Sequence, residues 1–294
     1  MVSLAASADY THQALESFSK TTLLAPEDSF HLIANDHHKV EFPHILQRFT
    51  RVHLLDNPSS FAENGNLLRK LALESGSDLY FLNNDIIFTP LWSEFLAIKE
   101  PVIAIPLCNQ DLQYQEGNFK LEPAMDLSDY LGSEEAFEKI AKEHQQKTKG
   151  VRQTLFSPFF CVRIPYEVLE RVGEFDTSFG KGGAEDHDYS LRTILAGSGV
   201  YHSLRCYLLH FMGRSTWRGG ESPEETKTRD GLYLKRFEEK WGAQLTSLCI
   251  KRDTSFIQQD EKLRSLAENN QWAELIRSVT PPETLQSLKQ GNAV

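Results

Sequence analysis

Cysteine is scarce, and the sequence lacks the short cysteine spacings that form zinc or redox sites. The four cysteines, Cys108, Cys161, Cys206 and Cys249, are scattered, and none belongs to a Cys-x-x-Cys pair. This spacing argues against both a disulfide framework and a thiolate zinc site. We expect reduced, mostly buried thiols.

Long hydrophobic runs and a leader-like start are also lacking. The chain opens Met-Val-Ser-Leu-Ala-Ala, with no basic segment followed by a long apolar stretch, so we expect no signal peptide. Apolar runs such as 102–107 are far too short to span a bilayer. These absences predict a soluble, cytoplasmic protein. Amphipathic C-terminal helices leave peripheral contact with the inner face of a membrane open.

Positive charge is in deficit. Lysine and arginine total 31 against 41 aspartates and glutamates, which gives a formal net charge of −10. Proteins that bind nucleic acid need a basic face, so this balance argues against nucleic acid as a partner. It leaves room for a local basic pocket that binds a diphosphate. With 294 residues, 40% of them hydrophobic, the chain can bury a substantial core.

The first half of the chain alternates short apolar runs with helical patterns. We expect strands at 2–6, 30–34, 52–55, 78–82 and 101–107, and helices at 10–24 and 63–74. This alternation is typical of a doubly wound, mainly parallel α/β sheet with flanking helices. Ligands bind such sheets beyond the carboxyl ends of the strands. Polar residues fall at those ends, namely Asp36, Asn57, Asn83 and Asp85.

The second half is expected to be less regular. It comprises a loop-rich stretch at 109–133, helices at 133–149, 166–172, 185–196 and 224–241, a strand at 154–163 and a strand ending at His210. We divide the chain into a nucleotide-binding half (about 1–107), an acceptor-binding half (about 108–242) and a helical C-terminal extension (243–294).

Three short motifs could carry chemistry, and each also has a purely structural explanation. Asn83-Asn84-Asp85 follows a strand, where a carboxylate could hold a hard divalent cation or form only a polar turn. Glu185, Asp186 and Asp188 follow two glycines at a helix start, where a carboxylate could act as general base or only favour the helix dipole.

The third motif is His210 with the segment that follows it. A lone histidine after a strand is usually structural. Here a glycine- and arginine-rich segment at 213–220 comes next. This segment could fold over a diphosphate, with Arg214 and Arg218 supplying paired donors.

Five motifs occur in a fixed order along the chain. They are Asn57 to Asn66, Asn83-Asn84-Asp85, Gly173-Glu174-Phe175-Asp176, Glu185 to Arg192, and His210. In this order they resemble the family 2 glycosyltransferases of the GT-A fold, especially the bacterial rhamnosyltransferase-like, polysaccharide-building branch. Residues 237–242, Phe-Glu-Glu-Lys-Trp-Gly, resemble the same branch. The resemblance covers about 2–242 and not the tail.

The resemblance implies a donor site for a nucleotide diphosphate sugar. Asp85 and His210 would be the protein ligands of a divalent metal, Mn²⁺ or Mg²⁺. Asp36 would read the base, which favours a UDP- or dTDP-sugar, and Asn83 would contact the ribose. The other residues expected to bind the nucleotide sugar are Ala6, Ser7, Asn57, Phe61, Asn66, Asn84, Arg214 and Arg218.

The resemblance also implies an inverting transfer of a hexose to a hydroxyl of a glycan, glycolipid or protein-linked sugar acceptor. Asp186 would be the base, and Glu185 would orient the acceptor beside Gly183 and Trp217. The metal and the two arginines would stabilise charge on the departing diphosphate while the anomeric carbon becomes oxocarbenium-like.

Other functions remain to be weighed. A nucleotidyltransferase usually has a glycine-rich, basic loop after the first strand, and a Rossmann dehydrogenase needs Gly-x-Gly-x-x-Gly there. This chain has Ala6-Ser7-Ala8-Asp9 instead. A catalytically weak member that binds a sugar nucleotide or glycan without transfer is favoured by Asn83 alone. The weak binder and the nucleotidyltransferase are the alternatives we keep.

Overall fold

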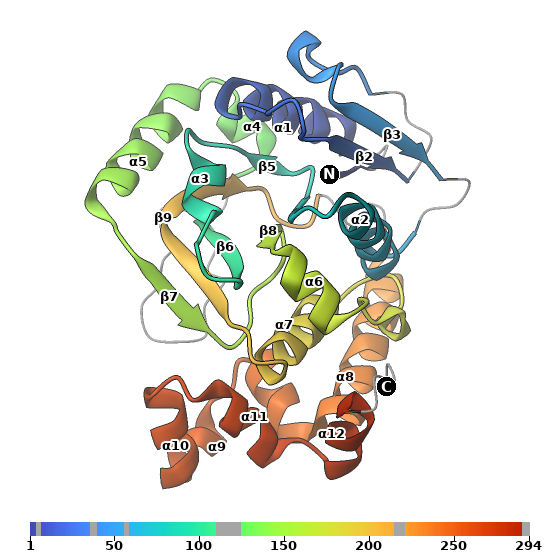
Figure 1. Cartoon of the computed structure of the whole chain (residues 1–294), viewed down its shortest axis with the longest axis vertical. Coiled ribbons are helices and arrows are strands. Elements are labelled where there is room, and N and C mark those ends of the chain that lie inside the picture. Colours follow the sequence, from blue (N-terminus) through green and yellow to red (C-terminus); the bar gives the residue numbers. More distant parts are fainter. Residues whose placement is uncertain (4–6, 36–39, 56–58, 110–124, 215–220, 290–294) are drawn as a thin grey trace.

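The structure is a computed structural model of the chain (Figure 1). It describes residues 1–3, 7–35, 40–55, 59–109, 125–214 and 221–289. Within this part, the predicted α/β fold with parallel strands, flanking helices and C-terminal helices is confirmed. The four cysteines are free and buried, as expected. Across the described residues, no helix combines the length and the hydrophobicity needed to cross a membrane.

The N-terminal sheet is entirely parallel, with strand order β1-β2-β3. Its elements are β1 (Val2–Ser3), β2 (Phe30–Ala34) and β3 (Thr50–Leu54), with helices α1 (Ala8–Thr21) and α2 (Phe61–Ser75). A parallel bridge between Val2 and Asn83 joins this sheet to the end of β4. Ser60 and Glu63 form a capping box that fixes the start of α2.

The second sheet has the order β4-β8-β6-β9-β5, with β7 also paired to β9. Its strands are β4 (Leu79–Leu82), β5 (Ile86–Ile87), β6 (Ile103–Cys108), β7 (Val151–Thr154), β8 (Cys161–Ile164) and β9 (Val200–His210). Only β6 and β9 pair in parallel, and the other pairings are antiparallel. The parallel character that the sequence predicts is therefore concentrated in the N-terminal sheet.

The predicted strand at 154–163 is wrong as a continuous strand, because β7 ends at Thr154 and β8 begins at Cys161. Pro158 lies between them and has no amide proton to donate to a strand ladder, so a continuous strand is disfavoured there. The strand predicted to end at His210 does end there, and it begins at Val200.

Helices cover the sheets and form the C-terminal part. They are α3 (Trp92–Leu96), α4 (Leu127–Tyr130), α5 (Glu134–Lys147), α6 (Tyr166–Val172), α7 (Glu185–Leu195), α8 (Pro223–Cys249), α9 (Ser255–Gln259), α10 (Glu261–Glu268), α11 (Trp272–Val279) and α12 (Pro282–Lys289). Short 3₁₀ helices occur at η2 (His44–Leu46) and η3 (Thr177–Phe179). Figure 1 shows the tail helices, in orange and red, gathered beside α7 and α8.

The tail is packed onto the rest of the molecule. Helix α11 packs against α7 and α8, and Trp272, Leu275 and Ile276 are buried in the main core. Helix α8 passes through Gly242, whose φ of 84° marks a kink just after Trp241. Helical backbone resumes after Gly242, so the kink coincides with the helix end at residue 241 that the sequence predicts.

His202 makes the stability of the fold sensitive to acid. It is buried on β9, and this burial lowers its pKa from 6.5 to about 4. The unfolded chain thus binds the proton more tightly, so the free energy of unfolding is undiminished above pH 6.5 and falls as the pH drops toward 4. The expected loss is about 3 kcal/mol.

Denaturant titrations across this pH range test the expectation. The His202→Gln variant cannot titrate at this position, so its stability should fall by about 3 kcal/mol less than that of the wild type. An identical pH dependence in the two proteins would contradict the assignment.

Candidate active site

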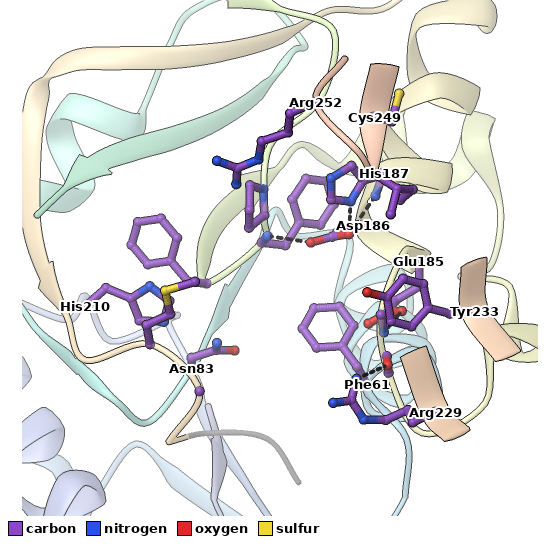
Figure 2. Close-up of a pocket in the computed structure, with 18 residues that line it drawn as sticks. Phe61, Asn83, Glu185, Asp186, His187, His210, Arg229, Tyr233, Cys249 and Arg252 are labelled. Carbon is purple, nitrogen blue, oxygen red and sulfur yellow. Dashed lines mark hydrogen bonds and ion pairs between the residues drawn. The ribbon is translucent and has the colours of Figure 1, made fainter. Parts of the chain in front are cut away.

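A pocket of about 290 Å³ lies where two strand ends, the start of α7 and the end of α8 come together. Asn83 and His210 line it from the ends of β4 and β9, and Glu185 and Asp186 line it from the first turn of α7. Figure 2 shows the first pair on one side of the pocket and the second pair on the other. Residues from three separate motifs therefore share one pocket.

Asp186 has one firmly held oxygen and one that is less engaged. Its Oδ1 accepts hydrogen bonds from the backbone N–H of His187 at 2.8 Å and from Nδ1 of the same residue at 2.5 Å. Its Oδ2 accepts a single longer bond, 3.3 Å, from the N–H of Phe159. The side chain is 17% exposed. A carboxylate that is fixed in place yet accessible has the geometry of a general base.

Glu185 differs from Asp186 in its surroundings. It is buried, and its Oε2 accepts a 2.5 Å hydrogen bond from the backbone N–H of Gly183. Burial, and then the charge of neighbouring Asp186, raise the pKa of Glu185 to about 8. A carboxyl group whose pKa is raised in this way favours its protonated form, which can donate a hydrogen bond to a ligand rather than take a proton from it.

Asp188, the third acidic residue of the motif, points away from the pocket into a buried ion-pair network. It is fully buried and contacts Arg192 at 2.8 Å, Lys240 at 2.9 Å and the indole N–H of Trp241 at 2.9 Å. Burial alone would raise its pKa, but Arg192 and Lys240 hold that pKa below the ordinary value. Asp188 is thus a structural anchor between α7 and α8.

Because Gly183 has no side chain, the ring of Tyr233 can approach its backbone closely, and this contact forms one wall of the pocket. Its φ is 152°, and a Cβ atom there would lie 2.1 Å from Cδ1 of Tyr233. The ring of Tyr233 therefore packs directly on the glycine backbone, which no other residue type would permit. Both residues line the pocket.

Asp85 and His210, the two expected metal ligands, lie side by side. Pairing of β5 with β9 places Ile86 opposite His210, and the N–H of Phe211 donates to the carbonyl of Asp85 at 2.9 Å. As a result Oδ1 of Asp85 lies 3.5 Å from Nε2 of His210. Asp85 is fully buried, whereas His210 reaches the pocket and stacks on Phe160 with ring centroids 4.6 Å apart.

The distance between the Asp85 and His210 side chains would allow both to bind the same cation, as two of its ligands. Two ligand atoms bound to the same ion at about 2.0–2.3 Å lie roughly 3–3.5 Å apart, and carboxylate with imidazole is an ordinary donor pair for a divalent metal. Among the described residues, no group of three or more histidines, cysteines and acidic residues could hold a metal. Any further ligands would come from a bound substrate, from water or from the part of the chain outside the described residues.

Two of the asparagines expected to bind the nucleotide sugar have structural partners. Asn84 is buried and donates to the hydroxyls of Ser7 and Thr11 at 2.8 and 2.7 Å. The amide of Asn66 both donates to and accepts from the backbone of Phe175, at 2.9 and 2.7 Å. Neither asparagine lines the pocket, and neither does Ser7. The Asn84 amide joins the segment after β4 to the start of α1, and the Asn66 amide joins α2 to the segment before η3.

The remaining residues predicted to bind the donor or the acceptor divide into two groups. The first group lies within the described residues and comprises Phe61, which lines the pocket, and Arg214. The backbone N–H of Arg214 donates to Oδ2 of Asp85 at 2.9 Å. The guanidinium of Arg214 lies over the ring of Tyr10. The second group lies outside the described residues and comprises Ala6, Asp36, Asn57, Trp217 and Arg218.

The pocket also contains residues that the sequence analysis missed. Arg229, Tyr233 and Arg252 line it from α8 and from the segment after α8. The guanidinium of Arg229 is held by Glu221 at 2.9 Å and by the carbonyl of Gly182 at 3.2 Å. No local motif marks these residues, because only the packing of α8 across the start of α7 brings them to the site.

Comparison with known proteins finds no family model and no curated protein that matches the chain. Among solved structures, GalNAc-T7 with UDP, GalNAc and Mn²⁺ is similar at a TM-score of 0.49 and 12% identity, covering 86% of this chain and 50% of that one. TarS from S. aureus is similar at a TM-score of 0.49 and 13% identity, covering 96% and 49%.

The chain spans about half the length of each of these two proteins. At such identity and TM-score the likenesses do not decide a function, and they give no support to the rhamnosyltransferase-like branch in particular.

Proposed function

We propose that this protein is an inverting glycosyltransferase of the GT-A type that moves a sugar from a nucleotide diphosphate donor to a hydroxyl of a glycan or glycolipid. The observation that carries the proposal is the arrangement of the pocket. The fixed but accessible carboxylate of Asp186 stands across the pocket from His210, which is paired with buried Asp85 (Figure 2). Such a site can take a proton on one side, and on the other it could hold a divalent cation that neutralises a diphosphate.

The chemistry of the transfer follows from these positions. Oδ2 of Asp186 takes the proton of the acceptor hydroxyl as that oxygen forms its bond to the anomeric carbon. The bond from the anomeric carbon to the diphosphate breaks at the same time, and its electron pair leaves with the diphosphate. Attack from the face opposite the leaving group inverts the anomeric configuration. Protonated Glu185 is placed to hold the acceptor by donating a hydrogen bond.

Asp85 and His210 are the residues that would hold a divalent cation, Mn²⁺ or Mg²⁺. Such a cation, when bound, supplies charge that neutralises the departing diphosphate. The N–H of Arg214 keeps the Asp85 carboxylate in position through its 2.9 Å hydrogen bond to Oδ2.

A thermal-shift screen of nucleotide sugars with and without manganese tests the proposal. A ligand that binds only the native state raises the apparent stability. We expect one class of nucleotide sugar to raise the Tm, and manganese to increase that shift. The manganese effect should disappear in Asp85→Asn and in His210→Gln. A screen in which no nucleotide sugar raises the Tm would count against the proposal.

Asp36 is proposed to select the base. A carboxylate accepts a hydrogen bond from the ring N–H of uracil or thymine, which cytosine lacks. Asp36→Ala is therefore expected to weaken UDP or dTDP binding by about tenfold or more, with the fold intact, because a hydrogen bond to a charged group is worth about 1.5–3 kcal/mol. Calorimetry with each nucleotide measures the change, and unchanged affinity would remove Asp36 from the site.

A further inference from the structure

A second hollow, of about 580 Å³, adjoins the candidate active site. It lies over the first half of α8 and the residues that follow that helix. Tyr233 and Ile250 line both this hollow and the active-site pocket. A molecule that has one end at Asp186 can therefore continue over these two side chains into the second hollow.

Two lysines and one aspartate are the charged residues that line the second hollow. Lys227 and Lys251 line it, and within the described residues neither side chain forms an ion pair. Asp230, the acidic residue of the lining, is already paired with Nη1 of Arg229 at 2.9 Å. Two lysines are thus left to bind an anion in a protein whose net charge is −10.

The second hollow has another feature that does not depend on charge, namely a glycine, Gly231. It lies inside α8, where glycine is less favourable than any residue except proline. A Cβ added to Gly231 would meet no atom of the described residues within 4 Å, so packing among those residues does not require glycine. Gly231 does line the second hollow. A bare backbone there makes room for something that approaches the helix closely.

We propose that the second hollow binds the body of an elongated, anionic acceptor glycan whose terminal unit reacts at Asp186. The inference rests on the proposed function. The chain of the acceptor would cross Tyr233 and Ile250, lie over Gly231, and place negative groups at Lys227 and Lys251. Uronic acid carboxylates and phosphodiesters share the chemistry that these lysines recognise.

Calorimetry with three tetramers of equal length provides the test. They are an oligouronate, a polyol phosphodiester and a neutral glucan, each titrated into the whole chain at low and at high salt. We expect an anionic tetramer to bind more tightly than the neutral one, and salt to weaken its binding. The stronger of the two anionic tetramers identifies the source of the charge. Equal affinity for all three would overturn the proposal.

Reversing the charges of Lys227 and Lys251 tests whether these two lysines contact the anionic tetramer. Lys227→Glu/Lys251→Glu should weaken binding of the anionic tetramer by about tenfold or more. The matched control is Lys235→Glu/Lys262→Glu, which changes the net charge equally at exposed lysines outside the hollow and should leave affinity within about twofold. Equal affinities in the two double variants would overturn the proposal.

The Gly231→Ala substitution is expected to raise the thermal stability and to weaken binding of the tetramer. Alanine favours the helix, so the Tm should rise by about 2 °C. Its methyl group fills the floor of the hollow, so tetramer affinity should fall while binding of a monosaccharide acceptor does not change. Unchanged tetramer affinity would count against the role of Gly231.

These measurements separate the inference from the function on which it rests. Anionic tetramers that bind through Lys227 and Lys251, without any turnover of a nucleotide sugar, would support the second hollow and contradict the glycosyltransferase. Turnover with a neutral acceptor, unaffected by charge reversal, would support the glycosyltransferase and contradict the second hollow.

Discussion

Replacing Asp186 with asparagine is expected to reduce sugar transfer by about 10²-fold or more while leaving donor affinity close to that of the wild type. Asparagine is nearly isosteric with aspartate, and its single oxygen can keep the hydrogen bond from the N–H of His187. Its NH2 group cannot accept the longer bond from the N–H of Phe159, and the amide cannot take a proton at neutral pH. Loss of a general base costs a rate of this size. The measurement is turnover with a competent acceptor, alongside calorimetry with the donor.

Glu185→Gln is the matched control for this change. Burial and the charge of Asp186 raise the pKa of Glu185 to about 8, so glutamine resembles the side chain as it stands at pH 7. Transfer by Glu185→Gln should therefore remain within about tenfold of the wild type, well above that of Asp186→Asn. If Glu185→Gln is the more damaging change, the base is Glu185. If Asp186→Asn loses donor binding, Asp186 is a binding residue.

Replacing Lys240 with methionine is expected to lower the free energy of unfolding by about 3–5 kcal/mol. Lys240 is 5% exposed, and its ammonium lies 2.7 Å from Oδ2 of Asp176 and 2.9 Å from Oδ1 of Asp188. Methionine keeps the apolar stem but removes the charge, which leaves two buried carboxylates with fewer partners. Urea denaturation measures the loss.

Two further variants show whether the effect comes from uncompensated charge. Asp188 keeps Arg192, so most of the cost should arise at Asp176, and adding Asp176→Asn to Lys240→Met should recover part of the lost stability. Lys235→Met alters an exposed lysine of the same helix and should change stability by less than about 0.5 kcal/mol. A Lys240→Met variant as stable as Lys235→Met would contradict this account of the network.

Much of the fold could be predicted from local sequence patterns. The strand at 30–34 and the helix at 166–172 have the predicted bounds, because short apolar runs and helical spacing are local signals. The break at Pro158 and the antiparallel pairings of the second sheet were missed. Strand direction depends on which segments meet in three dimensions, and periodicity along one segment does not encode it.

Local sequence patterns likewise predicted some residues of the candidate site and missed others. Asn83, Glu185, Asp186 and His210 could be placed at one pocket, because strand and helix ends are readable from the sequence. Asn66 and Asn84 could not be recognised as structural, since their partners, the Phe175 backbone and the Ser7 hydroxyl, are set by tertiary packing. Arg229 and Tyr233 were missed for a related reason: a polar helix gives no local sign of which residues will face a pocket.

Release of nucleoside diphosphate from nucleotide sugars tests the central claim most directly. The whole chain is incubated with UDP- and dTDP-sugars, with and without Mn²⁺, in the presence and absence of an acceptor glycan. We predict that one donor releases its diphosphate, that Mn²⁺ and the acceptor increase the rate, and that Asp186→Asn abolishes the increase due to the acceptor. Folded wild-type protein that releases no diphosphate from any of these donors would contradict the assignment of this pocket as a glycosyltransferase site.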